Sequence, residues 1–227
     1  SLAIKDVVAA ALKGGTTTVI DFACPNKGES LQYGLDLWHK KADGRTFCDY
    51  GFHMTIDDWN ESIRAELPKM FRQGVSSFKM YMTYPAMMVG DRDMYWALKE
   101  LRHLGGICGV HCENAGVIDG MIAEKKAAGL MGPSSHPETR PPYLEAEAIS
   151  RLLRIAQAAD CPVVIVHLTN EEALKEVEHA RKRGQKVYVE TCPQYLLLDE
   201  SVYYAPDYSQ AARYICAPPV SYTHLTL

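Results

Sequence analysis

A lysine and two histidines stand where side chains from separate strands could converge. Lys79 lies in the segment SSFKMYM, in which strand alternation places its side chain on the other face of the strand from Phe78 and Met80. Burial of such a lysine favours the neutral amine, which can form a Schiff base or capture carbon dioxide as a carbamate. His111 and His167 each end an apolar run, and imidazole is the usual ligand of zinc. This spacing indicates a metal site, and a lysine that merely extends toward water is the alternative.

A tyrosine near the lysine could take part in the same chemistry. Tyr84 follows Lys79 by five residues, beyond the end of the predicted strand. Its phenol could donate a hydrogen bond to a developing oxyanion, or it could be a rim aromatic that packs beside Pro85. Cys112 is not expected to be a nucleophile paired with His111, because adjacent residues of a strand face opposite ways.

The segments that carry these residues alternate between strand and helix patterns. Six short runs rich in β-branched and apolar residues are each followed by a helical pattern, which predicts a parallel sheet covered by helices. The predicted strands span 16–22, 47–53, 75–81, 107–111, 162–167 and 187–191. Polar residues end several of these strands, and no glycine-rich phosphate-binding motif is present. Both features favour a closed (β/α)8 barrel over an open doubly wound sheet.

Some polar residues are predicted to be solvated. Asp57 and Asp58 are expected to cap the helix that follows them. The Gly- and Pro-rich stretch 132–142, which includes His136, is expected to be a long surface loop. Glu145 and Glu147 are expected on the solvated face of an amphipathic helix.

Composition narrows the class of protein. The 227 residues include 24 basic and 28 acidic side chains, a formal charge of −4, which argues against nucleic-acid binding. The longest apolar runs fall far short of the ~20 residues that a membrane helix needs. The seven cysteines form no CxxC pair, and no secretion signal opens the chain, so a reducing cytoplasmic location is predicted.

Four motifs, in this order and at this spacing, resemble one enzyme family. FKMYMTY, VHCEN, VVIVHLTN and VETCPQYLLLD are similar to the dihydropyrimidinase and D-hydantoinase branch of the cyclic amidohydrolases. The resemblance runs from about residue 1 to 219 and implies an α/β fold, the (β/α)8 TIM barrel of metal-dependent hydrolases. The chain would hold about strands 2–7 of eight. The implied reaction hydrolyses the ring amide of dihydropyrimidines or hydantoins to N-carbamoyl amino acids.

The resemblance also implies a set of site residues. Two zinc or other divalent ions would be bridged by a carboxylated Lys79, and His111 and His167 would bind the second ion. Tyr84 would stabilise the oxyanion and contact the substrate, and the backbone at Ala217, in YICAPP, would hold the ring. The family's His-x-His pair and catalytic Asp lie outside this chain, so we expect the isolated chain to be inactive. The implied partners are a small cyclic amide and further copies of the chain, in a homotetramer or homodimer.

The chain is predicted to form one partial barrel domain, 1–220, followed by a tail, 221–227, that departs from the family. We attribute this tail to a sequence junction or artefact, and His224 is not counted as a ligand. Allantoinase and dihydroorotase are alternatives within the same enzyme class. A non-enzymatic scaffold of the collapsin-response mediator type is a further alternative, which the joint presence of Lys79, His111 and His167 argues against.

Overall fold

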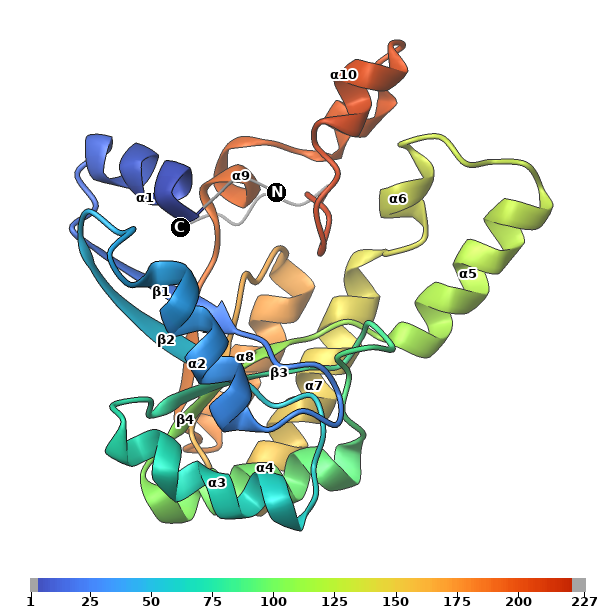
Figure 1. Ribbon diagram of the computed structural model, residues 1–227. Helices are drawn as coiled ribbons and strands as arrows, with labels where there is room; N and C mark the ends of the chain where they lie inside the picture. The colour runs from blue at the N-terminus through green and yellow to red at the C-terminus, as the bar shows by residue number, and fades with distance from the viewer. Residues whose placement is uncertain (1–3, 222–227) are drawn as a thin grey trace. The chain divides into compact units, whose positions relative to one another are not determined.

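The computed structural model describes residues 4–221 (Figure 1). The chain folds as two compact units. Unit 1 contains the residues up to Tyr81 together with Pro85–Gly109. Unit 2 contains Met82–Tyr84 and the residues from Val110 onward. One strand, β4 (Ile107–His111), therefore contributes its first three residues to unit 1 and its last two to unit 2.

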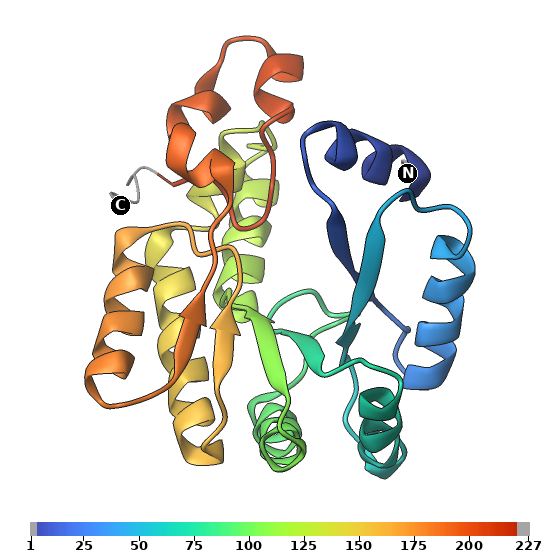
Figure 2. The ribbon, with the colours of Figure 1, turned by 90° about the vertical axis from the view of Figure 1, so that its left-hand side faces the viewer.

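Unit 1 is a parallel sheet with a helix after each strand (Figure 2). Its strand order is β1-β2-β3 followed by the start of β4. The register pairs Thr18 with Asp49 in β1 and β2, and Thr55 with Lys79 in β2 and β3. The elements are α1 (Ile4–Lys13), β1 (Thr18–Ala23), α2 (Leu31–Ala42), β2 (Asp49–Thr55), α3 (Glu61–Arg72), β3 (Ser77–Tyr81) and α4 (Asp91–Leu104).

The helices of unit 1 bury one apolar face each, as their periodicity predicts. The buried residues of α3 and α4 are Ile63, Leu67, Met70, Met94, Ala97, Leu98 and Leu101. The predicted cap of α3 is wrong, because Asn60 Oδ1 accepts the hydrogen bond from the Ile63 N–H at 3.0 Å. Asp57 is buried instead, and burial raises the pKa of its carboxyl to about 6.

Unit 2 begins with the end of β4 and continues the alternation. The Val166 N–H donates to the Val110 carbonyl at 3.4 Å, and β5 pairs with β6 in parallel from Val163 opposite Val187. Helices α7 and α8 lie side by side (Figure 2). The elements are α5 (Ala115–Ala127), α6 (Ser135–Glu138), α7 (Pro142–Ala159), β5 (Val163–Ile165), α8 (Glu171–Lys182), β6 (Val187–Val189), α9 (Pro193–Leu197), the 3-10 helix η1 (Glu200–Tyr204) and α10 (Tyr208–Ala212).

The six predicted strands are confirmed, with shorter bounds in unit 2. β5 ends at Ile165, so His167 lies in the turn after the strand. The predicted surface loop 132–142 is partly wrong, because it contains α6 and the half-buried His136. The His136 ring donates from Nε2 to the Cys216 carbonyl at 2.6 Å, which holds this stretch against the chain's last described segment.

The predicted single domain 1–220 and the foreign tail 221–227 stay predictions. Ser221 is buried, and residues 222–227, with His224, lie outside the described residues. Within 4–221, none of the helices has both the length and the hydropathy to cross a membrane.

Two helix glycines predict opposite effects of an added methyl group. In α2, a Cβ on Gly34 would lie 2.9 Å from Pro25 Cδ, so Gly34→Ala should destabilise the fold by about 1–3 kcal/mol. In α5, a Cβ on Gly120 would meet no atom within 4 Å, so Gly120→Ala should stabilise it by about 0.5–1 kcal/mol. Urea unfolding of both variants checks this, and equal midpoints would contradict the close contact at Pro25.

The buried Asp57 predicts a pH dependence of folding. Its pKa is about 6 in the fold against 3.8 ordinarily, so the folded state keeps a proton that the unfolded state loses. The contribution of this carboxyl group to the free energy of unfolding is greatest below pH 3.8 and is lost as the pH rises toward 6. The free energy of unfolding of wild type relative to Asp57→Asn should therefore fall over this range. The neighbouring variant Asp58→Asn is the control for the loss of one carboxylate. A wild-type advantage over Asp57→Asn that stays constant with pH would refute this assignment.

Candidate functional site

Three of the predicted site residues lie together in unit 2. The His111 ring, at the end of β4, is 4.6 Å from the His167 ring between centroids, at an interplanar angle of 69°. The Tyr84 ring lies 5.1 Å from the His111 ring. His111 is 3% exposed, and Tyr84 and His167 are half-buried.

Two members of the cluster have an unusual backbone conformation. Tyr84 has φ 67° and His167 has φ 44°, and Asp160 is the only other non-glycine residue with positive φ among those described. A side chain at positive φ crowds its own backbone and costs of order 1–3 kcal/mol, so the surrounding structure must enforce it. Such conformations cluster at functional sites, which makes the coincidence of Tyr84 and His167 informative.

The turn that contains His167 is fixed to the turn after β6. The Leu168 N–H donates to the Glu190 carbonyl at 2.9 Å. The Thr191 hydroxyl donates back to the Leu168 carbonyl at 2.7 Å. The backbone N–H and C=O of Leu168, the residue after His167, are thus both bonded to a neighbouring segment, which supports the backbone conformation of the turn.

A buried carboxylate sets the tautomer of His111. The His111 Nε2–H donates to Glu113 Oε2 at 2.6 Å, and Glu113 is 3% exposed. Arg140 Nε lies 3.8 Å from the other oxygen of this carboxylate. Because Nε2 carries the hydrogen, Nδ1 keeps its lone pair, which is the form of imidazole that binds a metal. Sequence reasoning missed Glu113, although its position two residues after His111 places it on the same side of an extended segment.

Lys79 belongs to unit 1, where β3 buries it. It is 3% exposed, and its Nζ lies 4.5 Å from the Tyr81 ring centroid and 6.0 Å from that of Phe22. The alternative in which the amine extends to water is therefore wrong. Its convergence with the imidazoles of unit 2 stays a prediction.

Ala217 lies half-buried in a segment that other elements hold in place. Its substrate-binding role stays a prediction. Three hydrogen bonds fix the residues around it: His136 Nε2–H to the Cys216 carbonyl at 2.6 Å, the Tyr195 hydroxyl to the Pro218 carbonyl at 2.8 Å, and the Val220 N–H to the Tyr203 oxygen at 2.9 Å. Tyr195, Tyr203 and Val220 also form a small apolar core there.

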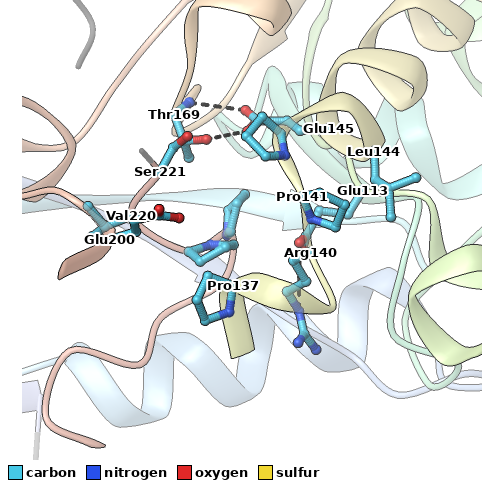
Figure 3. A pocket seen from close by; sticks show the side chains of 13 residues that line it. Glu113, Pro137, Arg140, Pro141, Leu144, Glu145, Thr169, Glu200, Val220 and Ser221 are labelled. Carbon is cyan, nitrogen blue, oxygen red and sulfur yellow. Dashed lines mark hydrogen bonds and ion pairs between the residues drawn. The ribbon is translucent and has the colours of Figure 1, made fainter. Parts of the chain in front are cut away.

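Glu145 is buried, which contradicts the predicted solvated position. Its Oε1 accepts the Thr169 N–H at 3.0 Å, and its Oε2 accepts from the Thr169 hydroxyl (Figure 3). Oε2 also accepts from Asn170 Nδ2 at 2.7 Å. Burial raises the pKa of Glu145 to about 8, hydrogen bonds from Thr169 and Asn170 oppose this rise, and the charge of Glu113 adds to it. Both carboxylates line the same pocket, with Arg140 beside them (Figure 3).

The imidazole pair fits a divalent metal ion by the chemistry of its donors. Two rings lie face to edge, and one has its other nitrogen bonded to a carboxylate, an arrangement typical of zinc ligands. Within residues 4–221, no group of three or more His, Cys, Asp or Glu side chains gathers as a metal-binding set. The pair would therefore need a further ligand of another type, which Lys79 is predicted to be.

Comparisons with known proteins agree with this chemistry. No protein-family model matches the chain. The D-hydantoinase of Streptomyces coelicolor is 41% identical over 212 residues, and the dihydropyrimidinase of Rattus norvegicus is 38% identical over 213 residues. These matches cover 93% of this chain but 45% and 41% of the two relatives. The chain thus spans less than half the length of the curated relatives it matches.

Solved structures give the same result for the fold. The dihydropyrimidinase of Brevibacillus agri aligns with a TM-score of 0.93 at 37% identity, over 96% of this chain and 48% of that one. The D-hydantoinase (dihydropyrimidinase) of Thermus sp. aligns with a TM-score of 0.89 at 34% identity, over 93% and 46%. With the parallel strand order, this shows an incomplete (β/α)8 barrel, as predicted. The chain is therefore homologous to the D-hydantoinases and dihydropyrimidinases and corresponds to a little under half of their sequence.

Proposed function

We propose that the protein carrying this chain hydrolyses the ring amide of a dihydropyrimidine or a hydantoin to an N-carbamoyl amino acid. The observation that carries this proposal is the cluster of Tyr84, His111 and His167, in which His111 is buried and the other two residues have a strained backbone. Strain is retained at sites where chemistry requires one geometry. The names of the homologues supply the substrate class, because they are D-hydantoinases and dihydropyrimidinases.

In this proposal, three residues of the chain hold a divalent metal ion such as zinc. His111 and His167 would contribute imidazole nitrogens. The neutral amine of Lys79 would add to carbon dioxide and release a proton, and the resulting carbamate would supply oxygen ligands. A second ion would need ligands that we expect outside this chain. When bound, such ions supply a hydroxide near neutral pH and polarise the substrate carbonyl.

The remaining groups of the site orient and stabilise. Glu113 keeps His111 in the tautomer whose Nδ1 is available as a ligand. The Tyr84 hydroxyl donates a hydrogen bond to the ring carbonyl oxygen as that oxygen gains negative charge. The backbone at Ala217 holds the ring through its amide groups. A proton for the departing ring nitrogen comes from the Asp that we expect outside this chain.

The same barrel and bridging lysine would serve allantoinase or dihydroorotase chemistry. A panel of dihydrouracil, hydantoin, allantoin and dihydroorotate, given to the longer protein that carries this chain, separates these activities. A scaffold without metal is separated by metal analysis of the same protein. A cytoplasmic location and assembly as a homodimer or homotetramer belong to the proposal as well.

Zinc binding by the chain should depend on the three predicted ligands. Purified chain in bicarbonate buffer should bind zinc, and His111→Ala, His167→Ala and Lys79→Ala should each weaken binding at least about tenfold, because each removes a donor. Isothermal titration calorimetry measures the affinity. His179→Ala, which changes an exposed histidine of α8, is the control and should bind like wild type. Undiminished binding in the Lys79 variant would remove the lysine from the site.

The isolated chain should not open dihydrouracil, because the His-x-His and Asp groups are missing from it. Turnover above that of a Lys79→Ala control would contradict this.

In the longer protein, Tyr84→Phe should lower kcat by about 100-fold or more, because it removes a donor to the oxyanion. KM should change much less, and steady-state kinetics with dihydrouracil and hydantoin test this. An unchanged kcat would exclude the role given to Tyr84.

A further inference from the structure

Within residues 4–221, the hydrogen bonds to the Glu145 carboxyl group come from another segment. Glu145 lies on α7, and it accepts three hydrogen bonds from Thr169 and Asn170, in the turn between β5 and α8. Asn170 in turn caps α8, since its Oδ1 accepts the Ala173 N–H at 2.9 Å. One buried side chain of α7 thus determines where the turn ends and where α8 begins.

The turn held by Glu145 contains His167. His167 follows the last residue of β5 by two positions, has φ 44°, and lies two residues before Thr169. A three-residue β5 gives the turn little support from sheet hydrogen bonds, so its conformation depends on contacts made further along. The contacts of Thr169 and Asn170 with Glu145 close the turn on the side away from the strand.

We propose that Glu145 is a positioning residue for His167: by binding the backbone and side chain of Thr169 and the amide of Asn170, it holds the His167 ring beside His111. That this ring is a metal ligand rests on the proposed function. That its position depends on Glu145 rests on the hydrogen bonds alone.

The chemistry of the contact requires an oxygen acceptor at both ends of the Glu145 carboxyl group. Thr169 N–H, Thr169 Oγ–H and Asn170 Nδ2–H are all donors, so both oxygens of residue 145 must accept. A glutamine has one oxygen and one NH2 group. In either orientation its NH2 group faces at least one of these donors, and a buried donor is left without an acceptor. Glu145→Gln is therefore a nearly isosteric change that disrupts the turn without opening a cavity.

The experiment combines ring NMR with zinc titration of the 227-residue chain. Long-range 1H–15N spectra of histidine-labelled, zinc-free protein report the ring of His167, assigned from the signals lost in His167→Ala. The variants are Glu145→Gln and Thr169→Val, which removes one donor and keeps the side-chain shape. Thr169→Ser keeps the hydroxyl and is the conservative rescue. Glu147→Gln, an exposed carboxylate of the same helix, is the matched control.

The proposal expects the His167 ring signals to shift or double in Glu145→Gln without zinc, and the zinc dissociation constant to rise about tenfold. Thr169→Val should lie between this variant and wild type, whereas Thr169→Ser and Glu147→Gln should match wild type within about twofold. If Glu145→Gln does not fold, the variants Thr169→Val and Thr169→Ser decide in the same way. Weaker zinc binding and shifted His167 signals in Thr169→Val, with wild-type behaviour in Thr169→Ser, support the proposal.

Two results would overturn the proposal. One is a folded Glu145→Gln variant with unchanged His167 signals and wild-type zinc affinity. The other is equal behaviour of Thr169→Val and Thr169→Ser. If the proposed function is wrong, the result is different: wild type then shows no zinc binding that depends on His111. The ring signals in zinc-free protein still support or refute positioning by Glu145 in that case.

Discussion

Burial of carboxylates is the physical constraint on which unit 2 depends. A carboxylate removed from water loses several kcal/mol of solvation free energy unless donors replace the water. Glu113 and Glu145 are both buried, and each has its donors in a segment that contains a predicted metal ligand. Any displacement of these segments would leave a buried carboxylate without its hydrogen-bond donors. The free-energy cost of that loss restrains the segments, and with them the imidazoles that they carry.

Unit 1 presents the opposite problem at Lys79, because this buried group is an amine. Lys79 is enclosed by β3 and near the rings of Phe22 and Tyr81, whose π-faces favour a cation. Addition of carbon dioxide would convert this group into an anion. The chemistry proposed for Lys79 thus reverses the charge that its aromatic neighbours favour, and metal cations would have to compensate for it.

Local patterns predicted the fold, and they also singled out the residues at the strand ends. The runs of β-branched residues predicted all six strands, and the two imidazoles were predicted from their position at or just beyond the end of two of these strands. The errors concern residues whose partners are distant in sequence. The partner of Glu145 is 24 residues away, and that of His136 is 80 residues away. Amphipathic periodicity describes only a helix face, so it cannot distinguish a carboxylate facing water from one that faces buried donors.

The cap of α3 shows the same limit at short range. Asp57, Asp58 and Asn60 are all good caps by residue type, and the choice of Asn60 depends on burial of Asp57 in the fold. Glu113 lies in the segment VHCEN, but its contact with His111 was not predicted, because residue type alone does not say which neighbour a carboxylate binds.

The positive φ of His167 places two incompatible demands on one position. Glycine would occupy this backbone conformation at the lowest energy, and asparagine is the next most tolerant, but neither has an imidazole. A glycine at position 167 would relieve the backbone strain but would remove the imidazole ring. The histidine therefore opposes the local conformational preference. Substitutions that relax the backbone at this position would be expected to remove the chemical function before they affect the fold.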